Sequence, residues 1–402
     1  MMSKEKRRVP KLRFPGFTED WEQRKADYIF KSVTEKGYPE LPVLSASQEL
    51  GMVYRDQNGI DIQHDKKNES SYKRVSPGQF VIHLRSFQGG FAYSEVEGIT
   101  SPAYTVMSFK NSSEQYGLFW KYVFKSETFI KRLETITYGI RDGRSISFSD
   151  FKSLMLQYPS FSEQELIGDL IAVIERGITL HQRKLDNLKL KKKALLQKLF
   201  PKNGERYPEL RFPGFTDAWE QRKLSDILVE RNEQQVETNE YPLMSFVQGH
   251  GVIPKGERYD RSFLVLDQSK KYKRTELGDF IYSSNNLETG SIGINKTGKA
   301  VISPVYSIFY GVSIGDSQFI GIMSLLPRFI TKMIRFRQGV VYGQWRIHEK
   351  DFLDISILIP SEAERTKITK LILSIEELIT LHQRKLDHLQ LQKKALLQQM
   401  FV

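Results

Sequence analysis

The sequence predicts an α/β (α+β) protein in which two similar domains are joined by two long helices. Three observations predict this fold. The chain has 402 residues, which is enough for two or three domains. Hydrophobic residues make up 40% of it and aromatic residues 12%, so folded cores can form. Near-identical segments open and close each half of the chain, with a period of about 200 residues.

The opening segment of each half is almost unchanged between the two copies. Leu12–Lys25 reads LRFPGFTEDWEQRK and Leu210–Lys223 reads LRFPGFTDAWEQRK, so that twelve of fourteen positions match. The closing segments, Ile178–Phe200 and Ile379–Phe401, match at eighteen of twenty-three positions. A period of this length indicates a whole domain and a long helix in each half, and not a solenoid repeat.

These repeats divide the chain into six parts. The first half consists of a repeated segment (1–25), a variable domain (26–159) and a long helix (160–200). The second half consists of a linker with the second repeated segment (201–223), a variable domain (224–360) and a long helix (361–402). Within the variable domains we expect short strands at Gln79–Leu84, Ser145–Phe148, Asp279–Ser283 and Ile355–Ile359. We expect helices at Glu114–Thr135 and Ser317–Arg335.

The long helices carry the clearest periodicity. Ser160 with Glu163, and Ser361 with Glu364, fit a capping box at the helix start. Residues then recur at alternating steps of four and three, which is typical of a coiled-coil seam. The central seam positions are Ile174, Ile178, His181, Leu185, Leu188, Ile375, Ile379, His382, Leu386 and Leu389. Lys192 and Lys393 are further polar interruptions of the seam.

Two copies of such a helix in one chain can cover each other's apolar stripe. Antiparallel pairing would relate the halves by a pseudo-two-fold axis and would bring His181 and His382 together near it, which we treat as a hypothesis. Polar residues within a seam commonly determine its register. We therefore interpret these histidines as register residues, in preference to catalytic or metal-binding ones.

Charge and composition limit the classes of function. Sixty Lys and Arg residues against 48 Asp and Glu give a net charge of +12, which favours a polyanionic partner such as nucleic acid. The chain has no cysteine, which excludes disulfides, thiolate metal sites and cysteine nucleophiles. The longest apolar run, Phe319–Leu326, is too short to cross a bilayer, and no apolar stretch follows Met1–Arg8. We expect a soluble cytoplasmic protein without a membrane partner.

The sequence contains neither an HExxH metal motif nor a GxGxxG dinucleotide loop. Gly293–Ala300 resembles a phosphate loop, but Ala300 replaces the magnesium-binding Ser or Thr, and a strand pattern follows where a helix is required. We predict no catalytic residues, no metal site and no enzyme activity. A nucleotide-dependent enzyme built on Lys299 is kept as an alternative.

Two variable domains, each followed by a near-identical long helix, resemble the DNA specificity (S) subunit of type I restriction–modification enzymes. The resemblance covers essentially the whole chain. It is carried by Leu12–Lys25 and Leu210–Lys223, by the PSxxE sequences at Pro159 and Pro360, and by the twin LHQRKLD…KKALLQ segments. It implies that the variable domains are target recognition domains, each reading one half of an asymmetric bipartite DNA sequence. The helices would form an antiparallel coiled coil that sets the gap between the half-sites.

The resemblance also implies the partners. A non-catalytic specificity subunit would bind double-stranded DNA, recruit two methyltransferase subunits and, through them, the restriction subunits. The chain itself would hold no cofactor, because S-adenosylmethionine, ATP and Mg²⁺ are expected only on the partner subunits. The alternative is a non-catalytic protein scaffold that does not read DNA.

Two loops in each variable domain are candidates for DNA contact. The loop after the strand at Gln79 or Asp279 contributes Arg85, Ser86 and Gln88 in the first domain and Asn285 and Asn286 in the second. A later Gly-containing loop contributes Tyr138, Arg141 and Arg144, and Tyr342, Gln344 and Arg346. Arg suits guanine, and Asn or Gln suits adenine, by bidentate hydrogen bonding. The recurring Lys73, Arg74, Lys273 and Arg274 are interpreted as phosphate-positioning or structural residues.

Residues that recur unchanged are poor candidates for reading two different half-sites. We interpret Trp21 and Trp219 as packing residues at the helix ends, with a methyltransferase contact as the alternative. The basic run Lys189–Lys193 is interpreted as a solvated helix face, with a surface for DNA or a partner as the alternative.

Overall fold

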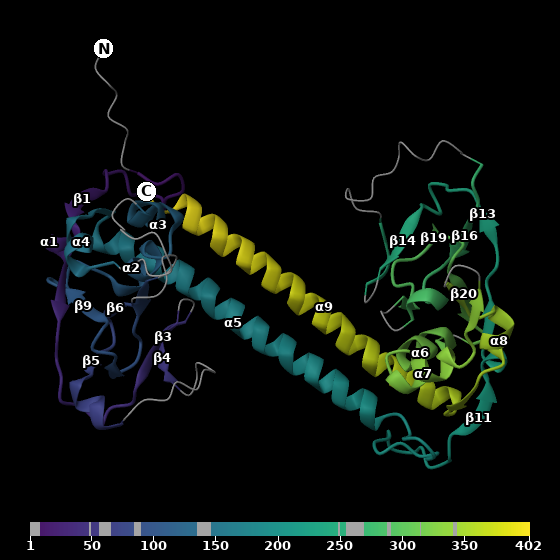
Figure 1. The fold of residues 1–402 in the computed structure, drawn as a ribbon. Coiled ribbons are helices and arrows are strands. Elements are labelled where there is room, and N and C mark those ends of the chain that lie inside the picture. Colours follow the sequence, from purple (N-terminus) through teal and green to yellow (C-terminus); the bar gives the residue numbers. More distant parts are fainter. Residues whose placement is uncertain are drawn as a thin grey trace. The chain divides into compact units, whose positions relative to one another are not determined.

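The computed structural model describes residues 9–47, 50–55, 66–83, 90–134, 146–247, 250–254, 269–287, 291–313, 315–340 and 344–402 (Figure 1). The chain divides into two compact units. Unit 1 is Met1–Arg183 with His382–Val402, and unit 2 is Lys184–Leu381. Each unit therefore contains one variable domain, one repeated segment and part of both long helices, α5 (Phe161–Lys198) and α9 (Glu362–Gln399).

Unit 1 is built from short antiparallel strands. A four-stranded sheet has the order β2 (Phe30–Val33), β9 (Thr105–Phe109), β6 (Phe80–Ile82), β7 (Phe91–Tyr93). Three strand pairs accompany it, namely β1 (Glu22–Lys25) with β10 (Met155–Tyr158), β3 (Leu44–Ser47) with β4 (Gly51–Tyr54), and β5 (Lys73–Val75) with β8 (Gly98–Thr100). The short helices are α1 (Ala26–Ile29), α2 (Gly117–Val123), α3 (Glu127–Glu134), α4 (Phe148–Ser153) and the 3₁₀ helix η2 (Lys66–Ser71).

Unit 2 repeats this plan with different loops. Its four-stranded sheet has the order β12 (Leu228–Glu230), β20 (Ser307–Gly311), β17 (Phe280–Tyr282), β18 (Ile292–Ile294), and a three-stranded sheet has the order β13 (Gln234–Gln235), β16 (Tyr272–Thr275), β19 (Ala300–Ile302). The pairs are β11 (Glu220–Lys223) with β23 (Ser356–Ile359), β14 (Met244–Val247) with β15 (Gly251–Pro254), and β21 (Gln338–Val340) with β22 (Gln344–Arg346). The short helices are α6 (Asp316–Met323), α7 (Pro327–Ile334), α8 (Glu349–Leu353), η3 (Leu224–Asp226) and η6 (Ser284–Asn286).

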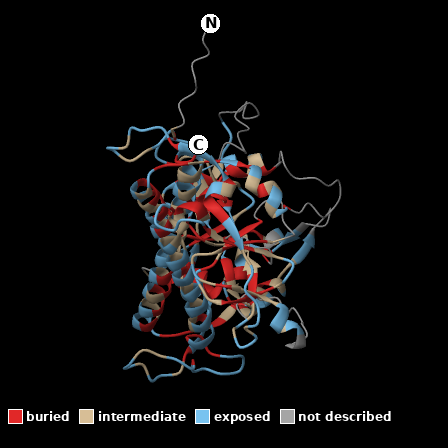
Figure 2. Ribbon diagram, turned by 90° about the vertical axis from the view of Figure 1, so that its left-hand side faces the viewer, coloured by how far each residue is buried: buried red, intermediate tan, exposed pale blue. Residues whose placement is uncertain are grey.

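All pairings between the strands of these sheets are antiparallel, which makes the fold α+β. Aromatic residues fill the core of each unit. In unit 1, Phe30 packs edge-on against Trp120, with ring centroids 5.3 Å apart. In unit 2, Phe309 packs against Phe352 at 4.8 Å. The buried residues, red in Figure 2, thus hold the sheets and short helices of each domain together.

Several sequence-based expectations are confirmed and others are wrong. The strands expected at Gln79–Leu84, Asp279–Ser283 and Ile355–Ile359 are present as β6, β17 and β23. The strand expected at Ser145–Phe148 is wrong, because Phe148 begins α4. The hydroxyl of Ser147 caps this helix by accepting a hydrogen bond from the Asp150 amide at 3.1 Å.

The helix expected at Glu114–Thr135 is divided into α2 and α3, and the helix expected at Ser317–Arg335 is divided into α6 and α7. In unit 1 the chain turns after α2, and the Ser126 hydroxyl accepts from the Phe129 amide (3.3 Å) at the start of α3. In unit 2, Pro327 occupies the first turn of α7, where its missing N–H costs nothing. The sequence Gly293–Ala300 connects β18 to β19, which lie in different sheets, and Lys299 pairs with Glu240. The strand expected after this sequence is confirmed as β19, in the place where a phosphate loop requires a helix.

Candidate nucleic-acid interface and helix pair

The two candidate reading loops of unit 2 lie against each other. The Trp345 amide on β22 donates to Oδ1 of Asn285 in η6 at 2.6 Å, and the Ile347 amide donates to Ser284 Oγ at 2.9 Å. Loops about 60 residues apart in the sequence are therefore joined through a side chain of one and the backbone of the other. The Trp345 amide uses one lone pair of the Asn285 oxygen, so the side-chain N–H groups and the second lone pair of this exposed residue can meet a ligand.

The β21–β22 hairpin presents polar and aromatic groups to solvent. Trp345 is 49% exposed, and the Arg346 side chain is 57% exposed at 3.9 Å from Glu349. The Arg337 guanidinium lies over the Trp345 ring, 6.0 Å from its centroid. We did not select Trp345 from the sequence. The one feature of the sequence that could have indicated it is a tryptophan within a loop of mainly polar candidate residues.

One backbone hydrogen bond closes the first candidate reading loop in each unit. In unit 1 the His83 amide donates to the Gly90 carbonyl at 2.9 Å, and in unit 2 the Ser283 amide donates to the Ser291 carbonyl at 2.7 Å. The backbone frame around the loop is thus shared, whereas the sequences RSFQGG and NNLETG differ.

Several predicted contact residues lie outside the described residues. They are Arg85, Ser86, Gln88, Tyr138, Arg141, Arg144 and Tyr342. For Asn286 and Gln344 the backbone belongs to η6 and β22, but their side chains also lie outside the description. All nine stay predictions.

The recurring Lys-Arg pairs make contacts within their domains. Lys73 donates to the Tyr104 carbonyl at 2.6 Å, and burial lowers the pKa of Lys73. Arg74 pairs with Glu97 (2.5 Å) and lies over the Tyr38 ring. In unit 2, Lys273 is buried at 3.8 Å from Glu349, while Arg274 pairs with Glu233 (2.8 Å) and Glu276 and lies over Tyr241. These contacts favour the structural role over phosphate binding.

Neither expected capping box is complete, because both glutamates have another partner. Arg13 of the first repeated segment binds Glu163 through two hydrogen bonds of 2.7 and 2.8 Å. Arg211 binds Glu364 in the same way, at 2.9 and 2.6 Å. Both carboxylate side chains are 1% exposed. The prediction that these carboxylates reach back to cap the helix is therefore wrong, although Ser361 Oγ does accept from the Glu364 amide (3.4 Å).

Each repeated segment also contacts the end of the other long helix. The Leu12 amide donates to the Gln399 carbonyl on α9, and the Leu210 amide donates to the Lys198 carbonyl on α5, both at 2.9 Å. Trp21 and Trp219 are both 1% exposed, as the packing interpretation predicted. A repeated segment thus joins the start of one helix to the end of the other, which accounts for its near-identity in the two halves.

The long helices run antiparallel in each unit. In unit 1, His181 faces His382, with 2.8 Å between their Nδ1 atoms, and Glu175 pairs with Lys393 at 2.7 Å. In unit 2, Lys192 pairs with Glu376 at 2.7 Å. All ten central seam residues are buried or half-buried. The hypothesis that the histidines meet is confirmed, and the interrupting lysines each pair with a glutamate of the other helix.

Glu175 also links the helix pair to the variable domain of unit 1. It accepts from the Tyr122 hydroxyl (2.9 Å) and lies 3.4 Å from Lys121 and 3.7 Å from Lys125. Burial opposes its charge, but the surrounding lysines outweigh burial and lower the pKa of Glu175 to about 2. Glu376 is the counterpart in unit 2, where Lys192 and Lys296 outweigh burial and lower its pKa. Lys189, Lys191 and Lys193 are exposed, in line with a solvated face.

Leucines on the outside of both helices form a repeated apolar feature. Leu180 and Leu381 are 51% and 45% exposed, and Leu190 and Leu391 are 68% and 67% exposed. They occupy equivalent positions in the two copies. Among the described residues no cluster of His, Asp or Glu could hold a metal ion. In the same part of the chain, no helix has the length and apolar character needed to cross a membrane.

The fold is that of a solved DNA-modification subunit. The chain is similar to the S subunit of the type I restriction–modification system from M. genitalium, with a TM-score of 0.62, 13% identity and coverage of 98% of this chain and 99% of that one. It also aligns with the HsdS subunit from Thermoanaerobacter tengcongensis, at a TM-score of 0.43, 14% identity and 97% coverage of both chains. No protein-family model and no curated protein matches the sequence. The fold is thus shown as that of a type I specificity subunit.

Proposed function

We propose that the chain is the non-catalytic DNA specificity subunit of a type I restriction–modification complex. Each variable domain reads one half of a bipartite, asymmetric target in double-stranded DNA. The observation that carries this proposal is that equivalent strands in the two units are followed by loops of different sequence. The equivalent strands β6 and β17 are each followed by a loop that one backbone hydrogen bond closes, but the loop sequence contains Arg85, Ser86 and Gln88 in one unit and Asn285 and Asn286 in the other. Two domains of similar fold with different loop residues should recognise different half-sites. A symmetric dimer, in contrast, recognises a palindromic sequence.

The helix pair sets the spacing in this proposal. The antiparallel contacts, together with the bidentate Arg13–Glu163 and Arg211–Glu364 pairs, support a fixed distance between each domain and its helices. Joining two short recognition elements raises the effective concentration of the second after the first has bound, and this multiplies specificity.

The partners in this proposal are two methyltransferase subunits and, through them, restriction subunits. The exposed leucines at equivalent positions of α5 and α9 support two equivalent docking surfaces, because single exposed leucines are ordinary but a repeated set on one helix pair is not. S-adenosylmethionine, ATP and Mg²⁺ belong to those partners, and the chain contributes no cofactor site.

The test is the sequence that the chain selects. The full chain is produced with methyltransferase partner subunits in a host without other modification systems, and the methylated bases of the genome are mapped. One bipartite, non-palindromic sequence with a constant gap is expected. Methylation without a common sequence, or complexes that bind every duplex equally, would support a protein scaffold in place of a DNA reader.

A further inference from the structure

A row of three cations lies along one face of α7 in unit 2. Phe329 and Met333 are the buried residues of this helix. Arg328, Lys332 and Arg335 follow at steps of four and three, so they share the helix face that the core does not use. Arg335 is the residue at which the helix ends.

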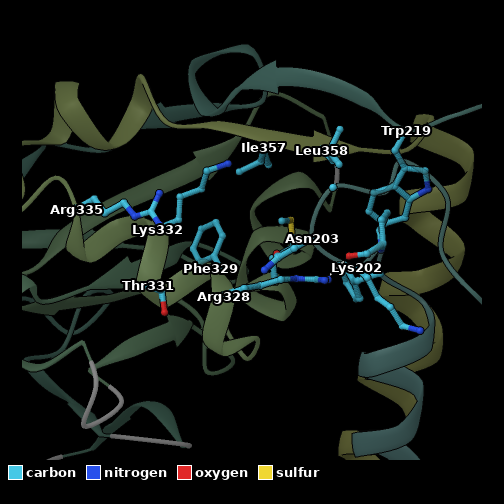
Figure 3. A pocket seen from close by; sticks show the side chains of 14 residues that line it. Lys202, Asn203, Trp219, Arg328, Phe329, Thr331, Lys332, Arg335, Ile357 and Leu358 are labelled. Carbon is cyan, nitrogen blue, oxygen red and sulfur yellow. Dashed lines mark hydrogen bonds between the residues drawn. The ribbon is translucent and has the colours of Figure 1, made fainter.

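The row borders a hollow of about 460 Å³ (Figure 3). Its apolar lining comes from the end of α5, the second repeated segment and β23, through Phe200, Trp219, Ile357 and Leu358. An apolar wall lowers the local dielectric constant and strengthens any charge interaction made beside it. The hollow is therefore a place where cations bind an anion more strongly than at an open surface.

The three cations have no carboxylate partner within the described ranges. Arg328 donates to the Pro201 carbonyl and Lys332 to the Ser356 carbonyl, which fixes both side chains without neutralising them. Other basic residues nearby are compensated, as Lys202 is by Glu209 at 3.7 Å. Burial lowers the pKa of both Arg328 and Lys332, so their charges are already partly dehydrated. Partly dehydrated cations of one sign, held in place, attract an external anion.

The row leads directly into the candidate reading hairpin. Two residues after Arg335, Arg337 lies over Trp345, and Arg346 is exposed at the end of β22. A continuous series of cations thus runs from the hollow to the surface proposed to read DNA. This continuity favours a DNA backbone over an acidic protein segment as the occupant.

The equivalent helix of unit 1 lacks the row. Thr128 stands where unit 2 has Arg328, as the shared Phe129 and Phe329 align the two helices. Arg132, in the place of Lys332, donates to the Met155 and Val402 carbonyls and to Gln157. The hollow beside it is only about 10 Å³. The two halves are therefore unequal at this position.

We propose that Arg328, Lys332 and Arg335 bind consecutive DNA phosphates beside the half-site read by the second domain. This inference rests on the proposed function and adds a contact to one half-site only. The three residues span about 10.5 Å of helix, and one DNA strand carries a charge about every 3.4 Å of its axis. Two or three neighbouring phosphates fit this span. Such contacts position the domain without reading bases.

The experiment measures the salt dependence of DNA binding by the full chain with its methyltransferase partner. Fluorescence anisotropy with a fixed duplex at several KCl concentrations gives the slope of log K against log salt, to which each phosphate contact adds about 0.9. Arg328→Gln/Lys332→Gln/Arg335→Gln should make the slope less steep by about 2 to 3. Because Arg328 also holds the Pro201 carbonyl, Lys332→Gln/Arg335→Gln is measured in parallel, with an expected change of about 2.

A matched variant removes three charges elsewhere. Lys370→Gln/Lys385→Gln/Lys394→Gln changes exposed lysines of α9 and should leave the slope as it is. Phosphate ethylation interference on the mapped target should then show interference flanking one half-site only, and the α7 variants should lose it.

An unchanged slope in correctly folded α7 variants overturns the inference. So does an unchanged slope together with loss of methyltransferase binding, because the row would then bind an acidic protein segment. A reduced slope in a chain that prefers no DNA sequence would support the phosphate contacts and contradict the proposed function instead.

Discussion

His181 of α5 and His382 of α9 lie with their Nδ1 atoms 2.8 Å apart and their ring centroids 5.0 Å apart. A hydrogen bond between two imidazole nitrogens needs one donor and one acceptor, so at least one ring is neutral. The residues are equivalent in the two halves of the sequence. The helix pair is thus joined at this point by a polar contact between two copies of one residue.

Replacing one histidine should destabilise the protein more than replacing both. His181→Leu or His382→Leu leaves a half-buried imidazole without its partner, which costs about 1 kcal/mol, whereas the double leucine variant restores an apolar seam. Urea unfolding of the full chain should therefore give lower midpoints for both single variants than for the double variant. Equal midpoints in all three would show that the contact does not contribute.

Of the two carboxylates that pair with lysines of the opposite long helix, Glu175 should stabilise the protein more than Glu376. Glu175→Gln removes the charge that balances Lys121, Lys125 and Lys393, at a cost of about 3 kcal/mol. Glu376→Gln should cost less, because Glu376 faces two lysines. The exposed neighbour Glu377 is the matched control, and Glu377→Gln should change the unfolding midpoint little. If the decrease in unfolding midpoint did not fall in the order Glu175→Gln, Glu376→Gln, Glu377→Gln, the ion pairs assigned to Glu175 and Glu376 would be contradicted.

The lowered pKa of Glu175 should make the stability of the folded chain sensitive to acid. Its pKa is lowered from 4.5 to about 2 in the folded chain, so its stabilising contribution is fully present above about pH 4.5. The contribution is lost progressively as the pH falls from 4.5 towards 2, because protonation then favours the unfolded chain. Thermal unfolding between pH 7 and 3 should show a smaller decrease in Tm for Glu175→Gln than for the unchanged protein. Parallel curves would contradict this assignment.

The repeated segments should stabilise each unit through their arginines. Arg13→Ala leaves the buried Glu163 carboxylate unpaired, and Arg211→Ala does the same to Glu364, with an expected loss of about 3 to 5 kcal/mol each. Arg24→Ala breaks an exposed pair with Glu22, which solvent screens, and should change the stability little. Chemical denaturation distinguishes these values. Equal, small effects of all three substitutions would contradict a structural role for the segments.

Asn285 should determine one position of the target. Asn285→Ala removes the amide group that supports the Trp345 backbone and faces outward, so discrimination should fall by about 1–3 kcal/mol at one base pair. Methylation mapping should then show one relaxed position in one half-site. Leu277→Ala, at a residue 67% exposed in the same domain, is the control. Relaxation in both half-sites would contradict separate readers.

The features that depend on local pattern were predictable from the sequence. The duplication and the seam periodicity indicated both long helices and the meeting of His181 with His382. The partner of Glu163 was not predictable, because Arg13 lies 150 residues away and a local capping role fits the same sequence. Phe148 alternates as a strand residue would, but the Ser147 cap and the burial of Phe151 favour a helix. Trp345 required the tertiary contact with Asn285 to be recognised.

The central claim is that one chain carries two independent DNA readers. Its most direct test replaces residues 26–159 with the corresponding domain of another specificity subunit and maps methylated bases with the methyltransferase partner present. With two independent readers, one half of the recognised sequence should change, while the other half and the gap stay as they were. A change in both halves, or an unaltered target, would contradict the claim.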